Sequence, residues 1–195
     1  MKHIALFLLV AFSAMNITSD ISAQTICENG FAGEYACDGY DLYTYFPLSS
    51  VGGGDNGNDC WGWVDSASGR EFVLFGRSDG MSVVEITDPL APSFIANLPT
   101  ATYPSLWRDI KVIGDYAFIG SEAGMHGMQI LDLTQVLDLG GFPFNITATS
   151  NYLGFGNAHN LAANPETNYV YGVGTNTFGG GLHIVDVSNP EAPFL

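Results

Sequence analysis

Short apolar runs alternate with polar, glycine-rich turns along most of this chain of 195 residues, and one such order recurs three times. In each copy an apolar or aromatic run is followed by a glycine-rich turn and a second apolar run that ends on an acidic residue: Glu85, Asp132 or Asp186. The three copies lie at residues 69–92, 114–136 and 167–193. The runs are short and bounded by Gly, Pro, Asn and Asp, which predicts β-strands.

Each copy also has an earlier strand-like run, and the first copy has a later one. These runs lie at residues 59–65, 107–114 and 159–164, and at 92–99. The residues after position 23 show no sustained 3.6-residue period, so 133–140 would form one turn of helix at most. Four strands in a repeat of about 45 residues are typical of a β-propeller blade. The sequence therefore predicts an all-β fold, a β-propeller-like repeat of four-stranded blades. A β-sandwich is the alternative, but it explains the strands without explaining the repeat.

The predicted blades do not complete a ring. About three blades are present, whereas a closed propeller typically has about four to eight. The third repeat stops at Leu195 after two residues of its fourth strand, so we expect an incomplete propeller, from either a truncated gene product or a partial sequence. If the chain exists as written, its exposed strand edges should tend to associate. Residues 42–48 resemble the fourth strand of the first blade and predict an orphan outer strand that would complete the last blade of a ring.

The N-terminus has the pattern of a secretory signal peptide. Lys2 and His3 precede an apolar run at 4–15, and a polar stretch then leads to the small residue Ala23. The run is short for a membrane span, although a buried strand or an uncleaved anchor is the alternative. We therefore predict a signal peptide over residues 1–23 and a secreted or cell-surface protein. Residues 24–58 would then form an N-terminal loop with the orphan strand, and 59–195 the blades.

Export changes the interpretation of the three cysteines. Cys27 and Cys37 lie ten residues apart in a glycine-rich stretch, and in an oxidising compartment they are expected to form a local disulfide. Cys60 lies beside Trp61 in a strand-like run, which predicts a buried free thiol.

The charge of the chain narrows the range of partners. The formal net charge is −15, with five lysines and arginines against 20 acidic residues. Such a surface repels phosphate backbones and anionic lipids, so neither nucleic acid nor an anionic membrane surface is an expected partner. The sequence also has no G-x-S-x-G, P-loop or H-E-x-x-H motif.

Polar residues recur where the predicted innermost strands begin and in the turns between the second and third strands. In an up-and-down blade both places lie on one face. The candidate ligand or metal residues on this face are Asn58, Asp59, Asp79, Arg108, Asp109, Glu122, His126, His159 and Asn160, with Arg77, Thr175 and Asn176 beside them. Oxygen-rich sets suit Ca²⁺, and histidine admits other divalent metals. A structural polar network is the alternative, and His183, inside a strand, is expected to pack in the core.

The segments that carry the repeat resemble a known family. The runs "VEITDPLAP" and "IVDVSNPEAP" resemble the LVIVD repeat, and the order of motifs from Cys27 to Leu195 is similar to that of the choice-of-anchor B family. The resemblance implies an exported bacterial protein with a propeller-like domain, and an anchor only in a longer form of the chain. Cys60 departs from the family, which usually has an aliphatic residue there.

No established activity comes with this resemblance. The first hypothesis is an extracellular binding module without catalytic activity that recognises an extracellular protein or a glycan. The alternative is a metal-dependent enzyme, a hydrolase or lyase, with its site on the propeller axis. A third interpretation is a structural spacer.

Overall fold

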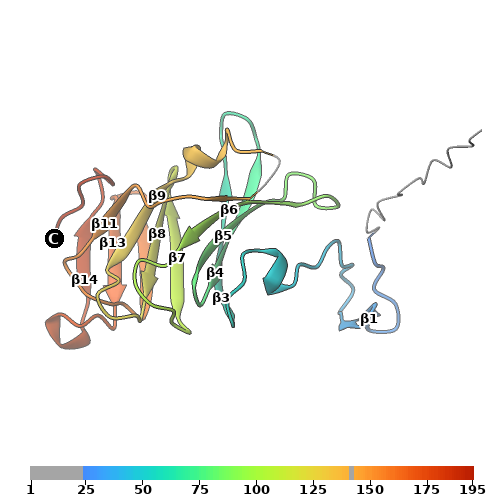
Figure 1. The fold of residues 1–195 in the computed structure, drawn as a ribbon, viewed down its shortest axis with the longest axis horizontal. Coiled ribbons are helices and arrows are strands. Elements are labelled where there is room, and N and C mark those ends of the chain that lie inside the picture. Colours follow the sequence, from blue (N-terminus) through green and yellow to red (C-terminus); the bar gives the residue numbers. More distant parts are fainter. Residues whose placement is uncertain (1–23, 141–142) are drawn as a thin grey trace, which may run out of the picture.

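The computed structural model describes residues 24–140 and 143–195, which form three β-sheets side by side and a small N-terminal module that projects from one end (Figure 1). The predicted signal peptide lies outside the described residues. Among those residues, no helix is long and apolar enough to cross a membrane.

The first sheet is a complete four-stranded blade with one added strand. Its strands are β3 (Gly57–Val64), β4 (Glu71–Arg77), β5 (Gly80–Glu85) and β6 (Ser93–Pro99), paired antiparallel in chain order. The added strand is β10 (Phe144–Asn145), which pairs parallel to β6 although it comes much later in the chain.

The second sheet is also a blade of four antiparallel strands. They are β7 (Arg108–Ile113), β8 (Tyr116–Ser121), β9 (Met128–Asp132) and β11 (Ser150–Tyr152). The turn of helix expected at 133–140 is the 3-10 helix η2 (Leu133–Val136), which Asp132 caps by accepting a hydrogen bond from the Thr134 amide.

The third sheet contains β12 (Asn160–Asn164), β13 (Tyr169–Val173) and β14 (His183–Asp186). The 3-10 helix η3 (Phe178–Gly180) lies between the last two strands. An isolated bridge joins Asp186 to Phe194 and begins a fourth strand. The prediction of an all-β fold of incomplete, propeller-like blades is therefore confirmed.

Two hydrophobic clusters hold the blades together, because alternate residues of a strand face opposite sides of its sheet. The first cluster lies between the first two sheets and includes Leu74, Val83 and Ile119, all fully buried. The second lies between the last two sheets and includes Phe118 and Val185. Ile119 and Phe118 are neighbours in β8 yet belong to different clusters, as the period of two requires.

His183 is almost fully buried in this second interface, as expected. Its ring packs edge-on against Tyr152 and Phe155. Its two ring nitrogens hydrogen-bond to the hydroxyls of Tyr152 and Thr177, and burial lowers its pKa.

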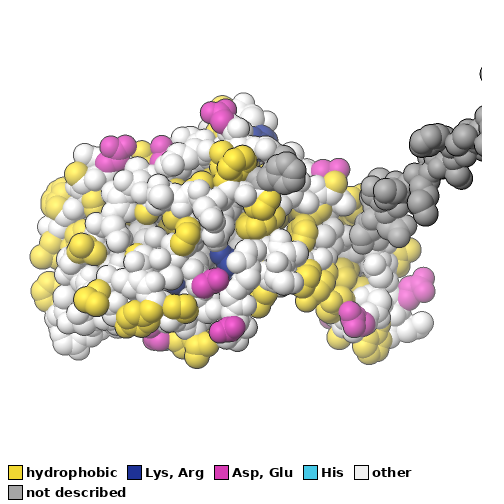
Figure 2. Space-filling view, in the orientation of Figure 1, with side chains coloured by type: hydrophobic (Ala, Val, Ile, Leu, Met, Phe, Trp, Pro, Cys, Tyr) yellow, Lys and Arg dark blue, Asp and Glu magenta, His cyan; other side chains and the backbone are white. Residues whose placement is uncertain are grey.

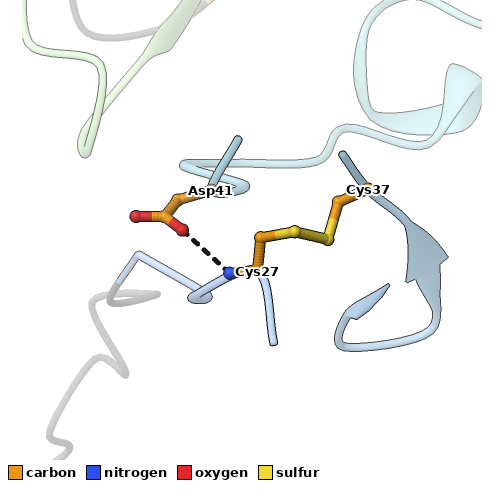
Figure 3. Close-up of a disulfide and its surroundings, with 3 residues drawn as sticks. All are labelled: Cys27, Cys37 and Asp41. Atoms are coloured by element: carbon orange, nitrogen blue, oxygen red, sulfur yellow. Dashed lines mark hydrogen bonds between the residues drawn. A yellow bond between two sulfur atoms is a disulfide. The ribbon is translucent and has the colours of Figure 1, made fainter. Parts of the chain in front are cut away.

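The N-terminal module is a disulfide-closed loop. Cys27 and Cys37 form the expected disulfide, and the amide of Cys27 donates a 2.8 Å hydrogen bond to Asp41 (Figure 3). The loop contains only the two-residue strands β1 (Phe31–Ala32) and β2 (Tyr35–Ala36). Local cross-linking therefore substitutes here for a hydrophobic core.

Breaking this disulfide is expected to affect only the module. In a Cys27→Ser, Cys37→Ser variant, limited proteolysis should cleave at residues 24–47 much faster, while the free energy of unfolding of the blades changes by less than about 0.5 kcal/mol. The measurement is urea unfolding followed by tryptophan fluorescence, since the three tryptophans lie in or directly before blade strands. A cooperative loss of blade stability would contradict the expectation.

Residues 43–47 pair with no strand among the described residues: they run along the outer face of the first sheet and lead into the 3-10 helix η1 (Leu48–Ser50). That this segment completes the last blade of a ring stays a prediction.

One local prediction is wrong in the described structure. Cys60 is exposed rather than buried. It lies opposite Phe75 on the face of the first sheet that points away from the second sheet, and the described residues place no blade against that face.

Candidate functional site

The innermost strand of each sheet is β3, β7 or β12, and the three strands start on the same side of the molecule. A groove of about 390 Å³ lies between their first residues. The groove is lined by Gly57, Asn58, Asp59, Trp107, Arg108, Asp109, His159 and Asn160. We call it the axial groove. The expectation that residues at the starts of the innermost strands come together is therefore met for six of the nine candidates.

One contact, repeated from blade to blade, brings these strand starts together. The Asp59 carboxylate accepts a 2.8 Å hydrogen bond from the Ile110 amide of the next blade. The Asp109 carboxylate accepts a 2.5 Å bond from the Leu161 amide one blade further on. Each carboxylate thus accepts from a backbone amide of the next sheet that has no partner within that sheet. The hydrogen bond links the innermost strands of two neighbouring blades.

This contact corrects the alignment of the repeats. When the innermost strands are aligned by the turns that follow them in the sequence, Cys60-Trp61 matches Arg108-Asp109. The strand pairing instead places Cys60 opposite Phe75 and Ile110 opposite Ile119, so Cys60 matches Ile110. Asn58-Asp59 therefore occupies the position of Arg108-Asp109. The alignment by residue type is therefore two positions out of register, because it follows the polar residues and not the strand pairing. A bulge between Gly57 and Cys60 also interrupts the ladder at the start of β3.

Lys111 neutralises the two carboxylates. Its ammonium group forms ion pairs with Asp59 at 3.4 Å and with Asp109, and it lies 4.6 Å from the ring centre of Trp61. Burial raises the pKa of Asp59, and the neighbouring Asp109 acts in the same direction. Burial acts to raise the pKa of Asp109 as well, but its hydrogen bonds outweigh this effect and lower the pKa.

Arg108 forms the buried floor of the groove rather than an open ligand. Its guanidinium donates to the Arg77 carbonyl at 3.0 Å and to the Thr100 hydroxyl at 2.9 Å, so it joins the first two blades. It also donates to Nε2 of His126 at 2.9 Å. Burial lowers the pKa of Arg108 to about 10. Among the described residues, no carboxylate hydrogen-bonds to this guanidinium, so neutral partners hold it.

His126 is fully buried beneath Arg108 and lies outside the groove. Because arginine only donates and a carbonyl only accepts, Nε2 accepts from Arg108 while Nδ1 donates to the Gly127 carbonyl at 3.0 Å. The ring is therefore neutral, and burial lowers its pKa to about 4. These contacts support a structural role for His126 in a polar network and not a role as a ligand.

Asp79 also lies away from the groove. It forms a 3.0 Å ion pair with the buried Arg77. Gly52 covers that guanidinium with φ +105°, and a Cβ at Gly52 would lie 2.7 Å from Nη1 of Arg77. The run of three glycines at 52–54 thus permits a close backbone approach to a buried ion pair.

The open wall of the groove is formed by His159 and Trp107, and Glu122 contacts His159 from outside the lining. Nδ1 of His159 lies 2.5 Å from the Glu122 carboxylate, and the side chain of His159 is 53% exposed. Trp107, 54% exposed, meets the imidazole edge-on with ring centres 6.2 Å apart. Asn160 donates to Asp109 at 3.2 Å and is itself exposed. Together these side chains offer an aromatic face beside several hydrogen-bonding groups.

The remaining turn residues form structural hydrogen bonds, one between two loops and one within a single turn. Asn176 accepts a hydrogen bond from the Gly156 amide, and Thr175 bonds to Thr177. Pattern reasoning missed Trp107 and Lys111, although both had a signal. Trp107 directly precedes Arg108. Lys111 follows Asp109 by two positions, so the side chains of Asp109 and Lys111 point to the same face of the strand.

In the described part of the chain, no three His, Cys, Asp or Glu side chains are arranged to hold a metal ion. Asp59 and Asp109 are two carboxylates that lie side by side in the groove, but both form ion pairs with Lys111. The ammonium group occupies the position that a cation would need.

Comparison with known families identifies the repeat. Residues 107–133 and 156–195 match the LVIVD repeat, so the chain carries LVIVD repeats in its second and third blades. The first blade lies outside this match, and the repeat in the sequence and the strand pairing both indicate it. No curated protein and no solved structure matches the chain.

Proposed function

We propose that this protein is an exported extracellular binding module whose axial groove binds a glycan. The observation that carries the proposal is the exposed Trp107 beside His159 and Asn160 in a groove of about 390 Å³. Sugar hydroxyls both donate and accept hydrogen bonds. The asparagine side chains of this groove can also do both, and its carboxylates can accept. The flat face of the indole offers an apolar surface to a sugar ring.

Charge also favours a neutral ligand. With a net charge of −15, the protein repels polyanions, whereas an uncharged glycan meets no such barrier. Export is supported by the signal-peptide pattern at 1–23 and by the disulfide, since disulfides persist in oxidising compartments. The resemblance to the choice-of-anchor B family supports the same location.

The proposal is tested with the purified protein on an array of extracellular oligosaccharides. Trp107→Ala is expected to weaken binding of the best oligosaccharide about tenfold or more, corresponding to about 1.4 kcal/mol. Tyr40→Ala removes an aromatic side chain that is 82% exposed in the N-terminal module and should leave affinity unchanged. Equal affinity of the Trp107 variant, or binding only to an extracellular protein, would overturn the glycan assignment.

An enzyme is the second candidate, and one observation favours it. Glu122 holds Nδ1 of His159, which is the way a carboxylate orients a catalytic imidazole and leaves Nε2 free to accept a proton. On a bound oligosaccharide, turnover that His159→Gln abolishes without loss of binding would establish catalysis. Unchanged oligosaccharide after long incubation supports the binding module.

A further inference from the structure

The sequence contains two Asn-Gly pairs, and one of them lies at the edge of the axial groove. Asn56-Gly57 leads from the three glycines at 52–54 into β3, and Gly57 lines the groove. Asn56 is exposed to solvent. Glycine has no Cβ to shield its backbone nitrogen, so this nitrogen can approach the side-chain amide of a preceding asparagine.

The backbone amide of Gly57 takes no part in the sheet. The Ser78 amide donates a 2.9 Å hydrogen bond to the Asn56 carbonyl. In an antiparallel ladder, this bond makes the facing residues Gly57 and Arg77 a non-hydrogen-bonded pair. The Gly57 amide therefore points away from β4, and it donates to no acceptor within residues 24–140 and 143–195.

Little structure has to open before Asn56 can react. Within the described part of the chain, its main chain forms one hydrogen bond, the one with Ser78. The three glycines at 52–54 have φ values between +82° and +105°, which glycine adopts without steric cost. Between them and Asn56, only the Asp55 amide is attached, by a 3.0 Å bond to the Ser78 hydroxyl. The segment is thus held to the rest of the first blade mainly at the Ser78 turn.

We propose that Asn56 is a site of spontaneous deamidation at the edge of the axial groove, and that the modification weakens ligand binding there. The Gly57 nitrogen loses its proton to solvent and attacks Cγ of the Asn56 side chain. The bond from Cγ to the side-chain nitrogen breaks, this nitrogen takes up a proton and leaves as ammonia, and a succinimide ring remains. Water then opens one of the two ring carbonyls, which yields aspartate or isoaspartate at position 56.

Isoaspartate changes the path of the main chain into β3. The chain then runs through the former side chain and is longer by one atom before Gly57. The carbonyl that accepts from Ser78 becomes part of a free carboxylate. Because Gly57, Asn58 and Asp59 follow directly and line the groove, isoaspartate is expected to displace this part of the lining.

Both products also add a negative charge to a protein that is already acidic. The net charge is −15, and Figure 2 shows acidic side chains spread over one face of the molecule with few basic ones. An uncharged glycan is not repelled by the added charge. The change in the main chain is therefore expected to affect binding more than the charge does.

The modification is tested in the full chain with Asn29→Gln, because Asn29-Gly30 is the other Asn-Gly pair. After several weeks at neutral pH, mass spectrometry should show a gain of about one mass unit, which peptide mapping assigns to residue 56. The rate should rise at mildly basic pH, because hydroxide removes the proton of the attacking nitrogen. Since only one backbone hydrogen bond has to open, the folded protein should react within about tenfold of the rate in urea.

Asn56→Gln is the matched control, since glutamine would have to close a larger ring and should keep its mass. Gly57→Ala would not serve, because a Cβ at Gly57 would lie 2.5 Å from the ring of Phe75. Two results would overturn the assignment: a folded protein that reacts more than about tenfold more slowly than the unfolded chain, or an equal mass gain in the Asn56→Gln variant.

The effect on binding rests on the proposed function and is measured separately. The isoaspartate form is isolated by chromatography and titrated with the oligosaccharide that binds best. Its affinity should be about tenfold or more lower, whereas Asn56→Asp should bind like the unmodified protein. Equal affinity of the isoaspartate form would show that the groove is unaffected. If no oligosaccharide binds the unmodified protein, the glycan proposal and this effect fail together, while the mass measurements still decide whether Asn56 reacts.

Discussion

Replacing Arg108 by alanine is expected to lower the free energy of unfolding by about 3 kcal/mol. The guanidinium donates to the Arg77 carbonyl, the Thr100 hydroxyl and His126. Removing it takes a donor from two buried acceptors and from the half-buried Thr100 hydroxyl, and it opens a cavity between the first two blades. Urea unfolding followed by tryptophan fluorescence measures the loss.

Two companion variants identify its cause. Arg108→Met fills most of the volume but restores no hydrogen bond, so a loss close to that of alanine assigns the effect to the unpaired acceptors. Arg70→Ala removes an arginine that is partly exposed and paired with Glu85, and it should cost about 1 kcal/mol or less. Equal losses for Arg108→Ala and Arg70→Ala would show that burial of Arg108 contributes nothing.

Acidification is expected to destabilise the protein by about 3 kcal/mol between pH 6.5 and pH 4 through His126 alone. Its folded pKa is about 4, below the ordinary value of 6.5. The unfolded state therefore binds the proton more readily, and stability is highest above pH 6.5 and falls as the pH drops toward 4. Protonation would also place a second cation against Arg108. The lowered pKa of His183 acts in the same direction.

The test is urea unfolding at pH 7, 5.5 and 4.5. His126→Gln keeps a neutral polar side chain beside Arg108 and should flatten most of the slope, even if stability at pH 7 is somewhat lower. His159→Gln changes an exposed histidine and should keep the slope, because His126 is still present. An unchanged slope in the His126 variant would show that acid acts elsewhere.

Residue patterns predicted part of the axial groove. The repeat placed Asn58, Asp109 and Asn160 on one face, because strand order and turn position follow from local sequence. It also placed Asp79 and His126 there, yet one lies beneath a glycine loop and the other beneath Arg108. Whether a side chain points into the groove or away from it depends on its contacts with neighbouring blades, which lie about 50 residues away in the chain.

The sequence by itself determined the strand repeat, the all-β class and the disulfide of Cys27 with Cys37, since each depends on spacing along the chain. Only the tertiary structure decided the path of residues 43–47, the exposure of Cys60 and the division between groove and core. These features depend on which sheet face packs against which, and that is decided by contacts between blades that are far apart in the chain. "HIVDVSNPEAPFL" at the end of the chain shows both levels: its pattern specifies strand β14, while only a packing partner decides whether Ile184 is buried.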